Sequence, residues 1–272
     1  MPIPKNWDNH GTNEIEILNI EPEPTELYTD EHGNKIAYWK NNSDEKNEYK
    51  IEFEITISNI NHDISKEDYD INYDETSEIY KKYTSSRNKT QSDAPEIIEK
   101  ANEIVGDTLD PVQKARKILK WTSTNIESDG NVPYDLPDAL SVSEYQKGHC
   151  GAFVNIFVAL SRASGIPARN VSLIHHPDDN QFKSGSHSDT FWGHLIAEIY
   201  LQDYGWVQID IVRGDWFGKI EENIIILSKG NEFELKNAEF ETKDIAFHLP
   251  LKSRADGSLV QFKSYIEVEK LN

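Results

Sequence analysis

The sequence has one cysteine among its 272 residues, and it has no run of about 18 consecutive apolar residues. A single thiol excludes an intramolecular disulfide and a zinc site built from several cysteines. The first residues, MPIPKNWDNH, lack the basic and apolar regions of a signal peptide. We therefore expect no membrane insertion. The cytoplasm is the default compartment, and secretion with a signal peptide removed ahead of Met1 is the alternative.

Basic residues are also few. The chain has 28 Lys and Arg against 48 Asp and Glu, so its formal net charge is −20. Nucleic acid phosphates and anionic membranes would repel such a chain at long range, and we therefore expect no nucleic acid partner. Apolar residues make up only 37%, but 6 Trp, 12 Tyr and 10 Phe supply enough surface for a packed core. The length suits one large domain or two smaller ones, and two is our expectation.

Apolar and polar residues alternate in the N-terminal part of the chain. The pattern is clearest at 49–57, Tyr-Lys-Ile-Glu-Phe-Glu-Ile-Thr-Ile, and it predicts a half-buried strand. Residues 26–28 and 35–39 flank an Asp-Glu-His-Gly-Asn segment at 30–34, whose glycine and asparagine suit the turn of a hairpin. We predict an antiparallel β domain over residues 1–85, built as a small β-sandwich.

Helical patterns begin after a polar segment at 86–95, which we predict to be a linker. A proline near the start and a glycine just past the end mark an amphipathic helix at 95–106, and Asp110-Pro111 opens a second helix. We assign a catalytic core to residues 96–235. Residues 236–272 are expected to hold further strands, which could return to the N-terminal sheet.

The cysteine, Cys150, lies at the start of a third predicted helix. It follows Gly148 and precedes an amphipathic segment that ends at Gly165. Free backbone N–H groups and the positive end of the helix dipole favour a thiolate there, which makes the sulfur a nucleophile near neutral pH. A packed, inert side chain is nevertheless the commoner state of a lone cysteine, so more specific residues are needed.

Residues 162–169 are more specific. They read Arg-Ala-Ser-Gly-Ile-Pro-Ala-Arg, in which a capping glycine and a proline end the helix and an apolar strand begins. Together with Gly148 and Cys150, this segment resembles the transglutaminase-like superfamily, whose core carries Gly-x-Cys and a helix with this exit sequence. The resemblance covers roughly residues 95–230. It implies an α+β, papain-like core, with helices packed on an antiparallel sheet.

The resemblance also implies a histidine that opens one strand and an aspartate that closes the next. His194 and Asp210 fit that pattern, on two apolar runs joined by a turn at 203–205. They lie at the same end of such a hairpin, so their side chains can touch. His194 would take the proton of Cys150 and later protonate the leaving group, and Asp210 would orient the imidazole. Ile196 departs from many relatives, which have tryptophan at that position.

The predicted activity is cysteine-dependent acyl transfer or hydrolysis at a peptide or glutamine-type amide, through a thioester acyl-enzyme. Its partner would be a protein or peptide substrate, and no cofactor is required. Transfer and hydrolysis share the first half-reaction, so the residues do not separate transglutamination from proteolysis or deamidation. The alternative is a catalytically silent binding module that recognises a protein or glycan partner.

Two local features leave alternatives open. The backbone N–H of Cys150 would form part of an oxyanion hole, and its second donor could be Trp121, Tyr134, Gln146 or His149. Histidines and aspartates in the polar segment 175–189 resemble a metal site in composition, but no helix or strand spacing fixes their geometry. A solvated loop or a lid over the site would explain that segment as well.

Overall fold

The fold is given by a computed structural model, to whose described residues all contacts and burial refer. It describes residues 2–7, 14–40, 48–56, 60–61, 63–64, 68–129, 138–175, 192–214, 216–220 and 224–230. Tyr134, the segment 176–191 and the strands predicted for 236–272 lie outside the described residues.

Most of the described strands lie before or after the helices in the sequence. The helices are α1 (Glu78–Thr84), α2 (Pro95–Val105), α3 (Pro111–Asn125), α4 (Ala139–Tyr145) and α5 (Cys150–Ala163). The N-terminal strands are β1 (Pro2–Ile3), β2 (Glu14–Glu21), β3 (Glu26–Thr29), β4 (Lys35–Tyr38), β5 (Lys50–Thr56) and β6 (Ile60–Asn61). Later strands are β7 (Glu127–Ser128), β8 (Lys147–Gly148), β9 (Ala168–His175), β10 (Trp192–Leu201), β11 (Gly205–Asp210), β12 (Trp216–Phe217), β13 (Lys219–Ile220) and β14 (Ile224–Lys229).

An antiparallel sheet with the strand order β12-β11-β10-β9-β14 forms the centre of the fold. Side chains alternate between its two faces, as they must in a strand. In β10, Leu195, Ala197 and Ile199 join the core cluster that contains α5, whereas Ile196 packs with Trp7 in a separate cluster. The sheet is therefore covered on both faces, which explains why β10 is apolar at successive positions.

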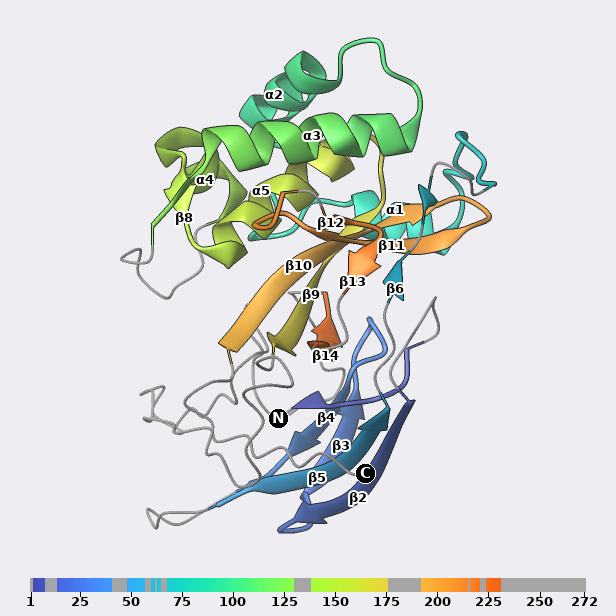
Figure 1. The fold of residues 1–272 in the computed structure, drawn as a ribbon, viewed down its shortest axis with the longest axis vertical. Helices are drawn as coiled ribbons and strands as arrows, with labels where there is room; N and C mark the ends of the chain where they lie inside the picture. Colours follow the sequence, from blue (N-terminus) through green and yellow to red (C-terminus); the bar gives the residue numbers. More distant parts are fainter. Residues whose placement is uncertain are drawn as a thin grey trace.

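Helix α5 lies between the sheet and the other helices. Its side chains from Gly151 to Arg162 are all buried. Figure 1 shows α2, α3 and α4 gathered with α5 at one end of the molecule, with β9 and β10 running beneath them. The helices α2 and α3 confirm the two predicted at 95–106 and after Asp110, and together with the sheet they confirm the α+β core.

Strands β1 to β5 form two small antiparallel sheets, β1-β4-β3 and β2-β5. They lie at the end of the molecule away from α2 and α3 (Figure 1). The hairpin predicted around residues 30–34 is β3 and β4, and β5 shows the predicted alternation of half-buried and exposed side chains. Phe53 and Ile55 of β5 pack against a small apolar cluster at the end of the central sheet, formed by Ile174, Ile225 and Leu227.

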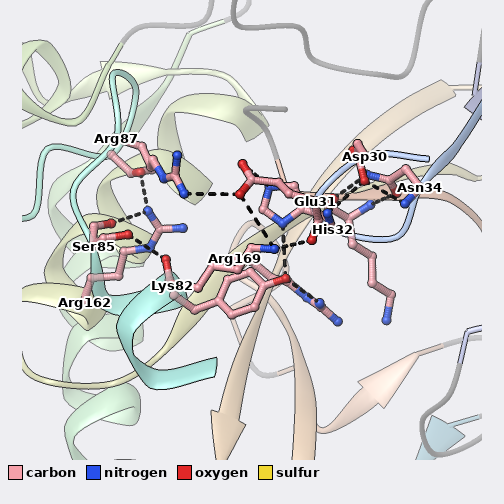
Figure 2. A network of polar contacts seen from close by, with 12 residues as sticks. Asp30, Glu31, His32, Asn34, Lys82, Ser85, Arg87, Arg162 and Arg169 are labelled. Atoms are coloured by element: carbon pink, nitrogen blue, oxygen red, sulfur yellow. Dashed lines mark hydrogen bonds and ion pairs between the residues drawn. The ribbon is translucent and has the colours of Figure 1, made fainter. Parts of the chain in front are cut away.

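The turn between β3 and β4 docks on the core through hydrogen bonds. The Asp30 carboxylate accepts from the backbone N–H groups of His32 and Asn34, each at 2.8 Å, and so shapes the turn (Figure 2). The Asn34 side chain then pairs with both backbone groups of Lys229: Nδ2 donates to the carbonyl at 2.7 Å, and Oδ1 accepts from the N–H at 2.8 Å. A buried amide thus joins the N-terminal hairpin to the end of β14.

The predicted linker, residues 86–95, is packed rather than free. Thr90 is fully buried, and its hydroxyl accepts a 2.9 Å hydrogen bond from the Arg162 guanidinium of α5. Arg87 faces the Glu31 carboxylate at 3.6 Å (Figure 2), so this segment also contacts the β3–β4 turn. The domain division at this segment stays a prediction.

Arg169, Glu198 and Lys229 form a buried charged cluster on the sheet face opposite α5. Glu198 is 0% exposed and accepts from Arg169 Nε at 2.8 Å and from Lys229 Nζ at 2.7 Å. Gln208 adds a 3.0 Å hydrogen bond, so β9, β10, β11 and β14 each contribute one member. Burial opposes ionisation of Glu198, but the two cations lower its pKa to about 2, while burial lowers the pKa of Lys229 to about 8. The last arginine of the 162–169 segment therefore has a structural partner.

Candidate active site

Cys150 is the first residue of α5, and the two residues of β8 set the direction of the chain just before it. β8 pairs in parallel with β7, and the Asp129 N–H donates to the Gly148 carbonyl at 3.0 Å. His149 is the N-cap, with an extended backbone (φ −95°, ψ −171°) that turns the chain into the helix. The thiol is thereby held at the N-terminal end of a buried helix, where the helix dipole favours its anion.

The structure brings the three predicted site residues together. His194 lies near the start of β10 and Asp210 at the end of β11, and these strands are antiparallel neighbours. His194 Nε2 lies 3.0 Å from Asp210 Oδ2, and the same imidazole hydrogen-bonds the Cys150 thiol. Because Nε2 is committed to Asp210, Nδ1 is the nitrogen left to face the sulfur.

Asp210 is held in place by several donors. Its side chain is 3% exposed, and Oδ1 accepts from the backbone N–H groups of Val212 at 3.1 Å and Arg213 at 3.3 Å. The Arg213 guanidinium lies 3.8 Å from Oδ2 and stacks over Trp216, with 4.2 Å to the ring centroid. Backbone bonds to one oxygen leave the other directed at His194. The sequence reasoning missed this support, although an arginine three residues after the aspartate is a visible signal.

The electrostatics of the site favour separated charges. Burial alone would raise the pKa of the Cys150 thiol, but hydrogen bonds from His149 and His194 and the charge of His194 lower it from 9.0 to about 6. The backbone N–H of Leu195 acts in the same direction. Burial disfavours the His194 imidazolium, yet Asp210 and the thiol raise its pKa from 6.5 to about 9. Between about pH 6 and about pH 9, the Cys150 thiolate and the His194 imidazolium therefore coexist.

The candidate oxyanion donors have different surroundings. The Gln146 side chain is exposed, on a residue with a left-handed backbone (φ 51°). Trp121 packs, half-buried, against the helical core. His149 is the candidate whose side chain reaches the sulfur. Tyr134 lies outside the described residues, so the second oxyanion donor stays an open prediction.

Metal and membrane features are absent from the part of the chain that the structure describes. No group of three or more His, Cys, Asp or Glu side chains is arranged to hold a metal ion among those residues. Most of the histidine-rich and aspartate-rich segment 175–189 lies outside the described residues. None of the described helices has the length and apolarity that crossing a bilayer demands.

Comparison with known sequences shows which family the core resembles. The sequence model of the transglutaminase-like superfamily matches residues 98–211, which contain Cys150, His194 and Asp210. Residues 98–211 are thus similar to the core of the transglutaminase-like superfamily. Outside that match lie the N-terminal strands and β14, which flank the transglutaminase-like core in sequence.

Individual relatives are distant or partial. An uncharacterized protein of Haemophilus influenzae is 32% identical over an alignment of 127 residues, which covers 40% of this chain and 34% of that protein. The aligned segment thus spans about a third of the relative's length. A candidate cysteine protease from Cytophaga hutchinsonii has a similar fold, with a TM-score of 0.50 and 16% identity over 87% of this chain and 84% of that one. The periplasmic domain of TgpA from Pseudomonas aeruginosa is more remote, with a TM-score of 0.38 and 15% identity over 50% and 47%.

Proposed function

We propose that this protein is a cysteine acyltransferase or hydrolase that acts on a peptide or glutamine-type amide. The arrangement of Cys150, His194 and Asp210 supports this proposal more than any other observation, because it supplies a nucleophile, a proton carrier and an orienting carboxylate within contact distance. The transglutaminase-like core is consistent with such chemistry. Fold similarity alone would not specify an activity.

The first half-reaction forms the acyl-enzyme. The Cys150 thiolate attacks the amide carbonyl carbon, and the carbonyl electrons move onto oxygen to give a tetrahedral intermediate. When the intermediate collapses, the C–N bond breaks and His194 gives its proton to the leaving amine. A thioester remains on the sulfur, and His194 is left neutral. The Cys150 N–H, unpaired within α5 because it belongs to the first turn, would donate to the oxyanion.

The second half-reaction resolves the thioester. Neutral His194 takes a proton from water or from a primary amine as that acceptor attacks the thioester carbonyl. Collapse of the second intermediate expels the Cys150 thiolate and releases either an acid or a new amide. Water gives hydrolysis and an amine gives transfer, so the two activities differ only in the acceptor that reaches the thioester.

A mass-spectrometric search for the acyl-enzyme tests the proposal. The protein would be incubated with peptide libraries, with and without an added primary amine, and Cys150→Ala would be the matched control. We expect a mass increase on the wild-type protein that is absent from Cys150→Ala, and a product that names the acceptor. Turnover of an amide by Cys150→Ala would overturn the assignment of the nucleophile.

Reactivity of the thiol separates this proposal from a silent binding module. Iodoacetamide labels the thiolate, so wild-type labelling should be half-maximal near pH 6, the value to which the pKa of Cys150 is lowered. An ordinary cysteine would become reactive only near its usual pKa of about 8.5. Labelling that rises only above pH 8 would favour the binding module.

A further inference from the structure

A permanent positive charge lies beside the proposed triad. Arg213 follows β11, and its Nε lies 3.8 Å from Asp210 Oδ2, the same oxygen that lies 3.0 Å from His194 Nε2. The guanidinium is therefore within about 7 Å of the imidazole, a distance at which unit charges still interact. The Arg213 side chain is 36% exposed, so its charge also faces the solvent from which substrates arrive.

The side chain of Arg213 is not what orients Asp210. Asp210 Oδ1 accepts from the backbone N–H groups of Val212 at 3.1 Å and of Arg213 at 3.3 Å, and Oδ2 faces His194. These backbone bonds remain whatever side chain stands at position 213. The guanidinium can therefore be replaced without displacing the carboxylate, and the effect left to explain is that of its charge.

The charge of Arg213 acts on the acyl-enzyme that the proposed function includes. Once the thioester has formed, the sulfur is uncharged and His194 has given its proton to the leaving amine. Asp210 is then the remaining charge of the triad, and it is negative. The Arg213 guanidinium, 3.8 Å from that carboxylate, offsets this charge. A triad without the arginine would attract a positively charged acceptor, whereas the triad and the arginine together have no net charge.

We propose that Arg213 is a specificity-determining residue that disfavours positively charged acyl acceptors and favours uncharged ones, water included. This inference rests on the proposed function and names the class of acceptor that resolves the thioester. The net charge of −20 would by itself draw cations towards the chain. Salt, however, screens exposed charges beyond about 8 Å at physiological ionic strength. Arg213 lies closer than that to the imidazole that must deprotonate the acceptor, so its local charge outweighs distant ones.

The partition of the acyl-enzyme between hydrolysis and transfer measures this effect. p-Nitrophenyl acetate would acetylate Cys150 without knowledge of the natural acyl donor, and Cys150→Ala would give the background reaction. Three small acceptors would then compete with water. The attacking form of glycinamide is uncharged, that of ethylenediamine carries a protonated second amine, and that of glycine carries a carboxylate. Differences in nucleophilicity cancel because each acceptor is compared between variants.

Arg213→Gln is the decisive variant, because it removes the charge from an exposed position and leaves the core untouched. The ratio of transfer to hydrolysis for ethylenediamine should rise at least about twofold, the effect of one unit charge about 8 Å away in bulk water. The ratio for glycine should fall by a similar factor, and that for glycinamide should not change. Arg213→Lys retains the charge and should match the wild type.

Arg87→Gln is the matched control for net charge. It removes a guanidinium whose ion-pair partner is Glu31, on the segment that contacts Arg162 near the C-terminal end of α5. Cys150 is at the N-terminal end of that helix. All three ratios of Arg87→Gln should therefore match the wild type. At about 1 M salt, where the Debye length is about 3 Å, the difference between wild type and Arg213→Gln should shrink.

Each contrary outcome is distinct. An ethylenediamine ratio that is the same in wild type and Arg213→Gln would refute the role of Arg213 and leave the proposed function intact. An equal change for all three acceptors would also refute it, because a disturbed site does not distinguish their charges. A rise that Arg87→Gln reproduces would refute it in favour of the net charge of the chain. If p-nitrophenyl acetate leaves no acetyl group on Cys150, the proposed function fails first.

Discussion

Asp210→Asn isolates the contribution of the buried carboxylate to the site. Asparagine keeps the size of the side chain and an oxygen that can accept from the N–H groups after β11, but its amide nitrogen cannot accept from His194 Nε2. The pKa of His194 lies at about 9 instead of 6.5, and Asp210 is the first of the groups that raise it. At roughly 1.36 kcal/mol per pKa unit, this rise in the pKa of His194 corresponds to about 3 kcal/mol in favour of the imidazolium over the neutral imidazole.

Loss of this carboxylate should narrow the pH range in which the enzyme is active. We expect the basic limb of the kcat/KM profile to fall by at least about one pH unit from its wild-type position near pH 9. The thiol midpoint should rise as well, because a less protonated His194 is a weaker partner for the thiolate. Asp203→Asn is the control: it removes a carboxylate from the turn at the other end of the same hairpin, at a left-handed position (φ 62°) that asparagine tolerates.

We also expect Asp210→Asn to change how the stability of the fold depends on pH. The pKa of His194 is higher in the folded protein than in the unfolded chain, so its stabilising contribution is complete below about pH 6.5 and is lost as the pH rises through about 9. The difference in unfolding free energy between wild type and Asp210→Asn should therefore be larger at pH 6 than at pH 9.5, as urea denaturation would measure. A basic limb that stays near pH 9, together with a pH-independent stability difference, would refute this account of His194.

Two further predictions concern the buried contacts away from the site. Glu198→Gln leaves the cations of Arg169 and Lys229 without an anion, so we expect it to lower the free energy of unfolding by about 3–5 kcal/mol. Lys229→Met retains the Arg169–Glu198 pair and should lower the free energy of unfolding clearly less. Urea denaturation would measure both effects. Equal costs for the two variants would contradict this reading of the cluster. Asn34→Ala leaves a buried backbone N–H and C=O of Lys229 unpaired and should cost about 2–4 kcal/mol. An effect below about 0.5 kcal/mol in denaturant unfolding would show that this contact does not stabilise the fold.

Local sequence patterns were enough to predict the parts of the fold that position the site. Helix periodicity and capping residues predicted α2, α3 and α5, and period-two alternation predicted β5. The resemblance to a known family pointed to His194 and Asp210, and their proximity followed from an antiparallel hairpin, in which the start of one strand lies beside the end of the next. In each case the structure depends on residues that are near one another in sequence.

Contacts between distant segments could not be predicted in this way. Asn34 and Lys229 are separated by 195 positions, and nothing in either local sequence indicates that they pair. In the polar segment 86–95, the buried Thr90 bonds to Arg162, a partner on another element that the local sequence does not indicate. The direction of the His149 side chain was also hidden, because an N-cap residue has an extended backbone and does not follow the helical spacing of the residues after it.

The pairing of Asn34 with β14 also bears on association between molecules. β14 is the last strand in the described order of the central sheet, and an edge strand with free backbone groups can recruit a strand from another chain. At Lys229 the two backbone groups are already occupied by a side-chain amide instead of by a strand. An amide of this kind satisfies the edge locally without extending the sheet, so the N-terminal hairpin protects this end of β14 against intermolecular β-sheet growth.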